Sequence, residues 1–449
     1  MISKSEHCFL TDFKNFFDFK NFFGVAQYKS RMKTRSVAHI FVLLAIIIYG
    51  ACALLVLIRS TPTPVKFIVE KRWVIYNGFC LRPYVHAGRD VTLRLLSSPT
   101  DPNDALLTKL PWDDPSTFED DLTLLSHTSA SALDEKYLAE LVTNWRGPIS
   151  LAVFCQGRFD EEYVLDKIDR VLGLLDNPED ASKLSVHIML DRVGKLSCDQ
   201  SESQLREESS EDTTFFASYP INTVRNVARL FSASTYIALA DSDFLFSAGF
   251  YDKVLPILRR NIPIGSKKAL LYRIFEISET EAQNRHHQLN KTDLKEVMKL
   301  RKGRVFHVRE HPHGHVVPNL TQWLRAPESN EPGLFNFTVD LRERYSWEFQ
   351  FTGLRDVPYF DEAFPYRYHN NVALRWEVCR AGYQLLPIED LFVYHTLEEN
   401  KNGKDDMKLK NRAMNRNRYK FFRAKKAFAA RMQRLYPDTI ENCPDLNHD

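Results

Sequence analysis

The stretch YPINTVRNVARLFSASTYIALADSDFLFSAGF, residues 219–250, indicates what kind of fold the chain adopts. A helix is expected to begin near Ile221, because polar and apolar side chains alternate there at helical spacing. The polar positions of this helix are Asn222, Arg225, Asn226 and Arg229. Residues 235–240 (TYIALA) are short and nearly all apolar, which is typical of a buried parallel strand. A helix followed by such a strand predicts an α/β architecture.

The predicted strand ends in two carboxylates, Asp241 and Asp243, with Ser242 between them. Open α/β sheets bind their ligands just beyond the carboxyl ends of the strands. Two carboxylates at this spacing can both reach one hard divalent cation, which can in turn hold a diphosphate. The same residues could instead be an ordinary polar turn, which is the commoner outcome for an isolated Asp-x-Asp. The neighbouring sequence must decide between the two.

The composition is that of a folded globular protein. The chain has 449 residues, enough for two or three domains, and 44% of them are apolar, 12% aromatic and 26% charged. These fractions exclude an intrinsically disordered chain. The net charge is only +2 at pH 7, so the charge balance gives no indication of nucleic-acid binding.

A long apolar segment, residues 37–58, follows a polar tail of residues 1–36. Its 22 residues can span a hydrocarbon core, which is about 30 Å thick. We interpret it as an uncleaved signal-anchor, because a signal peptide has a shorter apolar core and a shorter basic region before it. Basic residues cluster before the segment, which favours a cytoplasmic N-terminus. Sequons at Asn290, Asn319 and Asn336 agree with a lumenal downstream region.

Residues 59–118 are predicted to be a stem and lead-in, with strands over 67–76 and 91–96, and residues 119–443 a single domain. In that domain, strands are expected over 122–126, 149–155, 184–190, 235–240 and 269–277, and helices over 132–145, 161–175 and 293–300. This alternation predicts a mostly parallel sheet covered on both faces. The acidic segment 201–214 is expected to be a surface loop. The basic run 408–436 is helix-compatible, and a helix packed against the domain is favoured over a nucleic-acid patch.

The cysteines are unevenly distributed along the chain. Cys8 and Cys52 fall in the tail and the anchor, and five others lie downstream. In an oxidising lumen an odd number leaves at least one cysteine unpaired or intermolecular. Cys155, on the predicted strand 149–155, is the candidate for a buried free thiol. The sequence has no Cys-x-x-Cys and no zinc pattern.

A series of motifs runs in order through residues 119–443. They are Asp121-Leu122-Thr123-Leu124, Trp145-Arg146-Gly147-Pro148-Ile149-Ser150, Tyr219-Pro220-x-Asn222-x-x-Arg225-Asn226, Asp241-x-Asp243-Phe244, Pro318-Asn319, Trp347-Glu348, Val357-Pro358-x-Phe360-Asp361-Glu362-x-Phe364 and His395. With this set the chain resembles glycosyltransferase family 49, and the ordered set is far more specific than any one motif.

The resemblance implies a GT-A fold, type II topology in the Golgi membrane with a lumenal catalytic domain, and a UDP-sugar donor. It also implies Mn²⁺ or another divalent cation and inversion at the anomeric carbon. Asp241 and Asp243 match the metal-binding Asp-x-Asp, and His395 matches the imidazole that completes the metal site. Without the resemblance, a lone histidine after an apolar strand would usually be structural.

The resemblance also suggests residues for binding and catalysis. Asn222, Arg225 and Asn226 match positions expected to face the nucleotide, where arginine's planar donors suit phosphate or uracil oxygens. Arg225 could alternatively pair with a surface carboxylate. An inverting transfer needs a general base for the acceptor hydroxyl. Glu348 and Asp361 are the candidates, Glu348 slightly preferred, and a structural salt bridge is the alternative for either.

The acceptor region is expected to include His315, Asn319 and Asn370. Asn319 also heads a sequon, and a pocket residue could not easily carry a glycan, so only one of these roles can hold. Three nearby histidines, His307, His311 and His313, lack the regular spacing of a metal cluster, and a loop is favoured for them. Family members have a glycine after Phe364, whereas this chain has bulky residues at 365–369. This departure puts the acceptor, and to a lesser degree the activity, in question.

The sequence is compatible with two functions. The first is an enzyme that transfers glucuronate or N-acetylglucosamine from a UDP-sugar to a glycan on a glycoprotein or proteoglycan, with a partner glycosyltransferase as a further expectation. The second is a catalytically inactive relative that acts as a membrane-anchored glycan-binding partner. The intact Asp-x-Asp and His395 favour the enzyme, and the lost glycine favours the inactive relative.

Overall fold

The computed structural model describes residues 68–70, 73–86, 118–156, 161–191, 196–207, 219–309, 311–337, 339–341, 347–366, 368–397 and 403–443. The predicted tail, the predicted anchor at 37–58 and the expected strand at 91–96 lie outside these ranges. Within them, no helix is both long and apolar enough to cross a membrane.

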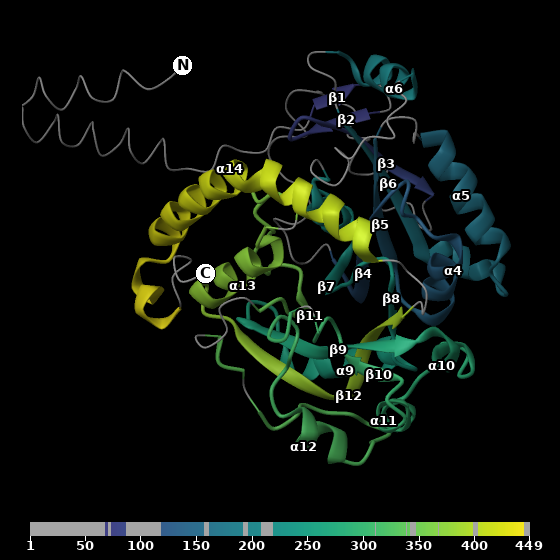
Figure 1. Ribbon diagram of the computed structural model, residues 1–449, viewed down its shortest axis with the longest axis vertical. Helices are drawn as coiled ribbons and strands as arrows, with labels where there is room; N and C mark the ends of the chain where they lie inside the picture. Colours follow the sequence, from purple (N-terminus) through teal and green to yellow (C-terminus); the bar gives the residue numbers. More distant parts are fainter. Residues whose placement is uncertain are drawn as a thin grey trace, which may run out of the picture. The chain divides into compact units, whose positions relative to one another are not determined.

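The described strands form one large mixed sheet (Figure 1). They are β1 (Ile68–Glu70), β2 (Trp73–Tyr76), β3 (Phe79–His86), β4 (Glu119–Ser129), β5 (Ile149–Cys155), β6 (Leu184–Asp191), β7 (Ser234–Leu239), β8 (Phe244–Phe246), β9 (Lys268–Ser278), β10 (Gly303–Val305), β11 (Gln350–Leu354) and β12 (Gln384–Leu397). Their order in the sheet is β1-β2-β3-β6-β5-β4-β7-β11-β9-β12-β8, and β10 pairs with β9.

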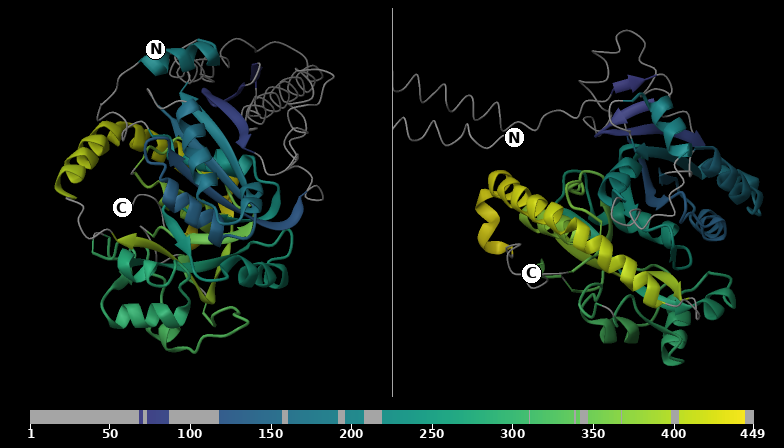
Figure 2. Two further views of the ribbon diagram at one scale, coloured as in Figure 1. Left: turned by 90° about the vertical axis from the view of Figure 1, so that its right-hand side faces the viewer. Right: turned by 45° about the horizontal axis from the view of Figure 1, so that its top comes forward.

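Helices cover both faces of the sheet. They are α4 (Glu135–Asn144), α5 (Glu161–Gly173), α6 (Cys198–Glu207), α8 (Ile221–Leu230), α9 (Phe250–Asn261), α10 (Glu279–Gln283), α11 (Lys291–Lys299), α12 (Leu320–Arg325), α13 (Asn370–Arg380) and α14 (Gly403–Leu435). In Figure 1, α4 and α5 lie on one side of the strands, and α13 and α14 lie on the other. Figure 2 shows α14, in yellow, running unbroken along the outside of the domain.

The apolar side chains of the central strands supply two cores, one on each face. On β5, Leu151 and Val153 pack into the core beneath α4 and α5, whereas Ala152 and Phe154 pack into the core beneath α8 and α13. Successive residues of a strand point to opposite faces, so a strand buried on both faces must be apolar throughout. This explains why the short apolar segments of the sequence were correctly predicted as strands.

The strand order creates a switch point at the centre of the sheet. β4, β5, β6 and β7 are parallel, but β5 and β6 extend the sheet on one side of β4 and β7 extends it on the other. Open α/β sheets bind ligands at such a point, beyond the carboxyl ends of the strands. His127 lies near that end of β4, and Asp241 follows the end of β7. The topology therefore brings together two residues far apart in the sequence.

The prediction of a mostly parallel sheet is wrong outside these four strands and the β9–β12 pair. The pairs made by β1, β2, β3, β8, β10 and β11 are antiparallel. Antiparallel neighbours need no crossover helix, so strand–helix alternation does not reveal them. Residues 79–86 pair with β6, so this part of the expected lead-in belongs to the main sheet.

The expected surface loop at 201–214 is wrong over its first part, because α6 continues to Glu207. A disulfide from Cys198, in the first turn of α6, to Cys80 on β3 ties this helix to the sheet. A second disulfide joins Cys379 to Cys443, and Cys155 is buried and belongs to neither disulfide. The prediction that Cys155 is a buried thiol is thereby confirmed.

Replacing Cys443 with serine is expected to lower the free energy of unfolding by about 2–4 kcal/mol, because the unfolded chain regains the entropy of the loop. The loop closed by Cys379 and Cys443 has a sequence separation of 64 residues. Urea unfolding of the oxidised proteins measures this difference. In dithiothreitol, where the disulfides are reduced, the wild type and Cys443→Ser should have the same free energy of unfolding. A difference in stability that persisted there would come from the serine side chain and not from the lost disulfide.

Candidate functional site

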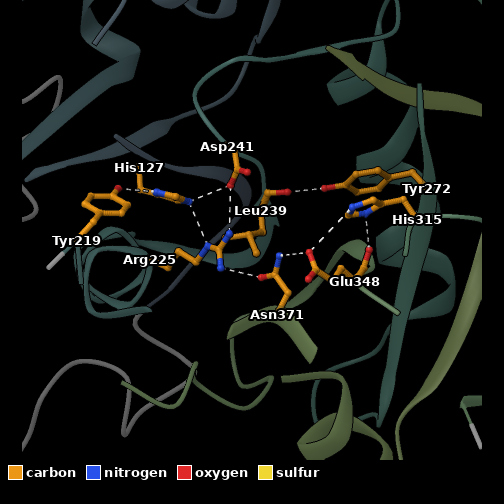
Figure 3. A network of polar contacts seen from close by, with 9 residues as sticks. All are labelled: His127, Tyr219, Arg225, Leu239, Asp241, Tyr272, His315, Glu348 and Asn371. Carbon is orange, nitrogen blue, oxygen red and sulfur yellow. Dashed lines mark hydrogen bonds and ion pairs between the residues drawn. The ribbon is translucent and has the colours of Figure 1, made fainter. Parts of the chain in front are cut away.

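The Asp241 carboxylate at the end of β7 is held by two side chains (Figure 3). His127 Nε2 lies 2.9 Å from Asp241 Oδ1, and Arg225 Nη2 donates to the same oxygen at 3.3 Å. His127 comes from β4 and Arg225 from α8, so three elements meet at this carboxylate. The other oxygen, Oδ2, accepts no hydrogen bond from any residue that the structure describes.

His127 is buried between Tyr219 and Asp241, and both its ring nitrogens have partners. Its Nδ1 lies 2.9 Å from the Tyr219 hydroxyl. Burial lowers the pKa of His127, and the positive charge of Arg225 lowers it further, so the pKa falls below its ordinary value despite Asp241. His127 Nε2 faces two partners, because Asp241 Oδ1 lies 2.9 Å away and Arg225 Nε is directed at the same nitrogen at 3.1 Å. Only the neutral tautomer with its proton on Nε2 can donate to Asp241, and Tyr219 then donates to Nδ1.

Asp241 is a carboxylate at neutral pH. Burial by itself would raise its pKa, but the hydrogen bond from His127 and the charge of Arg225 outweigh burial and hold the pKa of Asp241 well below its usual range. The ionised form is the one that binds a cation. The partners of Asp241 therefore prepare it chemically for the role predicted from the sequence.

Asp243 and His395 lie beside each other on neighbouring elements. His395 on β12 is opposite Phe244 on β8, and this register puts its Nε2 3.3 Å from Asp243 Oδ2. The Asp243 side chain is 54% exposed and that of His395 is 28% exposed. Both can therefore reach a ligand that approaches from solvent.

These side chains fit a divalent cation by the chemistry of their donors. Carboxylate oxygens from Asp241 and Asp243 and a nitrogen from His395 suit Mn²⁺ and related ions. In the ranges that the structure covers, no three His, Cys, Asp or Glu side chains form a ready-made metal centre. Cations that act on phosphates are commonly held by one or two carboxylates together with the phosphate oxygens. A site completed by the substrate is consistent with the residues present.

A second chain of contacts leads from Arg225 to Glu348 (Figure 3). Arg225 Nη1 donates to Asn371 Oδ1 at 2.7 Å, and Asn371 Nδ2 donates to Glu348 Oε2 at 3.4 Å. The Glu348 side chain is 28% exposed. Arg225 thus bridges the Asp241 carboxylate on the sheet and a second carboxylate that is accessible to solvent.

Glu348 is supported by the segment around His315. The Glu348 backbone N–H donates to the Gly314 carbonyl at 2.7 Å, and His315 Nδ1 is 2.9 Å from the Glu348 carbonyl oxygen. His315 Nε2 lies 4.0 Å from Glu348 Oε2. Burial lowers the pKa of His315, although the neighbouring Glu348 opposes the shift. His315, predicted for the acceptor region, therefore lies directly beside the preferred base candidate.

Asp361, the other base candidate, lies in a different environment. Its Oδ2 accepts from Arg431 Nη2 at 3.1 Å, and the same guanidinium donates to Glu377 at 2.8 Å. Among the described residues, none of its hydrogen bonds or ion pairs reaches the Asp241–Glu348 network. The salt bridge that the sequence left as an alternative is present, and a catalytic role of Asp361 stays a prediction.

Asn222 and Asn226 hold the segment around Asp361 against α8. Asn222 Nδ2 donates to the Asp361 carbonyl at 2.8 Å, and Asn226 exchanges hydrogen bonds with the backbone of Phe360 at 2.9 and 3.1 Å. Both asparagines are buried, and Arg225 is 2% exposed. Because these side chains are engaged inside the protein, their contact with a nucleotide stays a prediction. Arg225 pairs with Asp241, whose side chain is 38% exposed.

The remaining acceptor-region candidates, Asn319 and Asn370, lie at the starts of different helices. Asn319 is exposed at the start of α12, which leaves it accessible as a sequon requires, and none of its hydrogen bonds within the described residues connects it to the Asp241–Glu348 network. Asn370 is buried as the first residue of α13, and its neighbour Asn371 makes the contacts to Arg225 and Glu348. His307 follows β10 in a turn and stacks on Phe306.

The bulky residues that replace the family glycine pack against their neighbours. Tyr366 meets Tyr219 edge-on, with ring centroids 5.4 Å apart, and Tyr368 stacks on Phe421 of α14 at 4.9 Å. Tyr219 in turn contacts His127. The altered segment is therefore part of the support around Asp241.

Sequence reasoning missed two residues of this network, His127 and Asn371. His127 directly follows the predicted strand 122–126, at the strand end where ligands bind, and this position was the available signal. Asn371 adjoins Asn370, which was named in its place. The choice between these neighbours depends on where α13 begins.

Comparisons with known proteins agree with these observations. The family model "Glycosyl-transferase for dystroglycan" matches residues 121–437. Beta-1,4-glucuronyltransferase 1 of Danio rerio is 25% identical over 347 residues, which cover 72% of this chain and 75% of the relative. Xylosyl- and glucuronyltransferase LARGE2 of Homo sapiens is 25% identical over 292 residues, which cover 64% of this chain and 34% of that relative.

Among solved structures, that of S. aureus TarS covers 72% of this chain and 44% of its own, with 11% identity and a TM-score of 0.34. The family model, by contrast, spans more than half of the chain and includes both Asp241 and Glu348. The chain is a glycosyltransferase, and it belongs to the family of glycosyl-transferases for dystroglycan, glycosyltransferase family 49.

Proposed function

We propose that this protein is a metal-dependent, inverting glycosyltransferase with a GT-A fold. It transfers glucuronate or N-acetylglucosamine from a UDP-sugar to a glycan on a glycoprotein or proteoglycan. The observation that carries the proposal is the chain of contacts that links Asp241, beside Asp243 and His395, to Glu348 through Arg225 and Asn371.

The two ends of this chain suit the two halves of an inverting transfer. At one end, Asp241, Asp243 and His395 would hold a divalent cation such as Mn²⁺, which would stabilise the diphosphate of the leaving UDP. At the other end, Glu348 would accept the proton of the acceptor hydroxyl as that oxygen attacks the anomeric carbon. Arg225 and Asn371 fix the separation of the two ends, because both side chains are hydrogen-bonded on each side.

The names of the relatives support glucuronate as the sugar transferred, since they describe glucuronyl as well as xylosyl transfer. The apolar segment 37–58, the basic residues before it and the downstream sequons support a single-pass type II protein of the Golgi membrane. The acceptor and the linkage follow from neither observation.

A donor screen tests the proposal. The full-length protein in detergent is incubated with Mn²⁺, one UDP-sugar at a time and a panel of glycan acceptors, and released UDP is measured. We expect UDP release that requires both the metal and an acceptor, and that is highest with UDP-glucuronate or UDP-N-acetylglucosamine. Glycan binding without turnover of any donor would instead support the inactive, glycan-binding relative.

A further inference from the structure

We infer that His127 is a positioning residue of the metal site, which orients the Asp241 carboxylate so that Oδ1 is occupied and Oδ2 faces the cation. This inference rests on the proposed function, because it presupposes that Asp241 binds a metal. It concerns a residue outside every motif by which the family was recognised.

The first observation is that the His127 ring is fixed on both sides. Its nitrogens contact the Tyr219 hydroxyl and Asp241 Oδ1, each at 2.9 Å. The side chain is 6% exposed, and Tyr219 is itself packed against Phe154 and Tyr366. A ring held in this way defines the direction from which Oδ1 receives its hydrogen bond.

The second observation is that Arg225 would form a bidentate pair with Asp241 if His127 were absent. A guanidinium presents a fork of donors that favours a bidentate pair with a carboxylate. Here Arg225 reaches Asp241 with Nη2 alone, at 3.3 Å, because its Nη1 donates to Asn371 and its Nε is directed at His127 Nε2 at 3.1 Å. The His127 ring therefore lies where Nε would otherwise reach the carboxylate. The terminal torsion of an aspartate is broad, so only its partners decide where the second oxygen points. Without His127, Asp241 is free to turn both oxygens toward Arg225, away from a cation.

The test compares variants of the full-length protein by the dissociation constant for Mn²⁺ in the presence of saturating UDP, measured by calorimetry, and by the melting temperature. His127→Ala is expected to raise this constant about 10- to 100-fold, the usual effect of losing a partner of a metal ligand. His127→Gln should recover much of the loss, because its amide can donate to Oδ1. Tyr219→Phe keeps the ring and removes one hydrogen bond, so a smaller rise is expected.

The matched control is His187→Ala. His187 is a fully buried histidine of β6, and its Nε2 lies 2.8 Å from the Ser150 hydroxyl. This variant should melt at a lower temperature yet keep the Mn²⁺ dissociation constant of the wild type. In transfer assays, His127→Ala should raise the Mn²⁺ concentration needed for half-maximal rate, while excess Mn²⁺ restores most of kcat.

Normal Mn²⁺ binding by His127→Ala, together with the same loss of thermal stability as His187→Ala, would reduce His127 to a structural residue and overturn the inference. If His127→Ala does not fold, unaltered binding by Tyr219→Phe and His127→Gln has the same consequence. A wild-type protein that transfers sugar but binds no divalent cation even in the presence of UDP would overturn the metal assignment in the proposed function itself.

Discussion

Asp243→Asn is expected to lower kcat/KM for sugar transfer by at least about a thousandfold. An amide binds a divalent cation far more weakly than a carboxylate, so the negative charge of the leaving diphosphate would no longer be neutralised by the metal. The structure predicts little effect on folding. Asp243 is more than half exposed, and its ion pair in the described part of the chain is with His395, which is neutral unless protonated. Initial rates at saturating UDP-sugar, with the melting temperature measured in parallel, separate catalysis from stability.

Asp252→Asn is a matched control for this substitution. Asp252 lies on α9, its side chain is 47% exposed, and it pairs with Arg146 at 3.2 Å. Like Asp243, Asp252 is about half exposed and has an ion-pair partner among the described residues, but it lies outside the candidate site. Removing its charge should therefore leave the transfer rate near that of the wild type. If Asp243→Asn also kept full activity, the assignment of Asp241 and Asp243 to a cation would be wrong.

Glu348→Gln is expected to lower kcat about 10²- to 10⁴-fold, because the amide cannot accept the proton of the acceptor hydroxyl. Glutamine has nearly the same shape, and its side-chain oxygen can still accept from Asn371. The KM for the UDP-sugar should therefore change little, since Asp241, Asp243 and His395 are untouched. Steady-state kinetics with the donor and the acceptor varied separately measure both quantities.

Asp361→Asn provides the contrast. It weakens the ion pair with Arg431, which holds α14 to the segment around Phe360. We expect a lower melting temperature and a kcat close to the wild-type value. The opposite pattern, a stable protein without turnover for Asp361→Asn and an active Glu348→Gln, would identify Asp361 as the base.

The parts of the fold that could be predicted are those determined by nearby residues. The segment 149–155 is apolar at every position, and it forms β5 with those bounds. Asp241 and Asp243 could be proposed as a pair because a single residue, Ser242, separates them and a strand ends just before them. Helix α8 could be predicted from its spacing, although the partners of its polar residues could not.

The contacts that complete the site depend on the order of the strands. His127 and Asp241 are 114 residues apart, and Arg225 and Asn371 are 146 residues apart. Nothing local to either pair indicates that they meet. The choice between Asn370 and Asn371 is similar, because one residue on a helix turns the side chain by about 100°. The ion pair of Asp361 could not be predicted for the same reason, since its partner Arg431 belongs to an element 70 residues away.

Helix α13 is fastened at both of its ends. Its first turn carries Asn371, which reaches Arg225 and Glu348, and its last turn carries Cys379, which is bonded to Cys443. During synthesis on the ribosome, β4 with His127 and β7 with Asp241 just after it emerge long before Cys443. The nascent protein can therefore form the carboxylate side of the centre before the support for Asn371 exists. A chain that terminates before Cys443 would keep the cation ligands and lose the covalent tether of the helix that aligns them with the base.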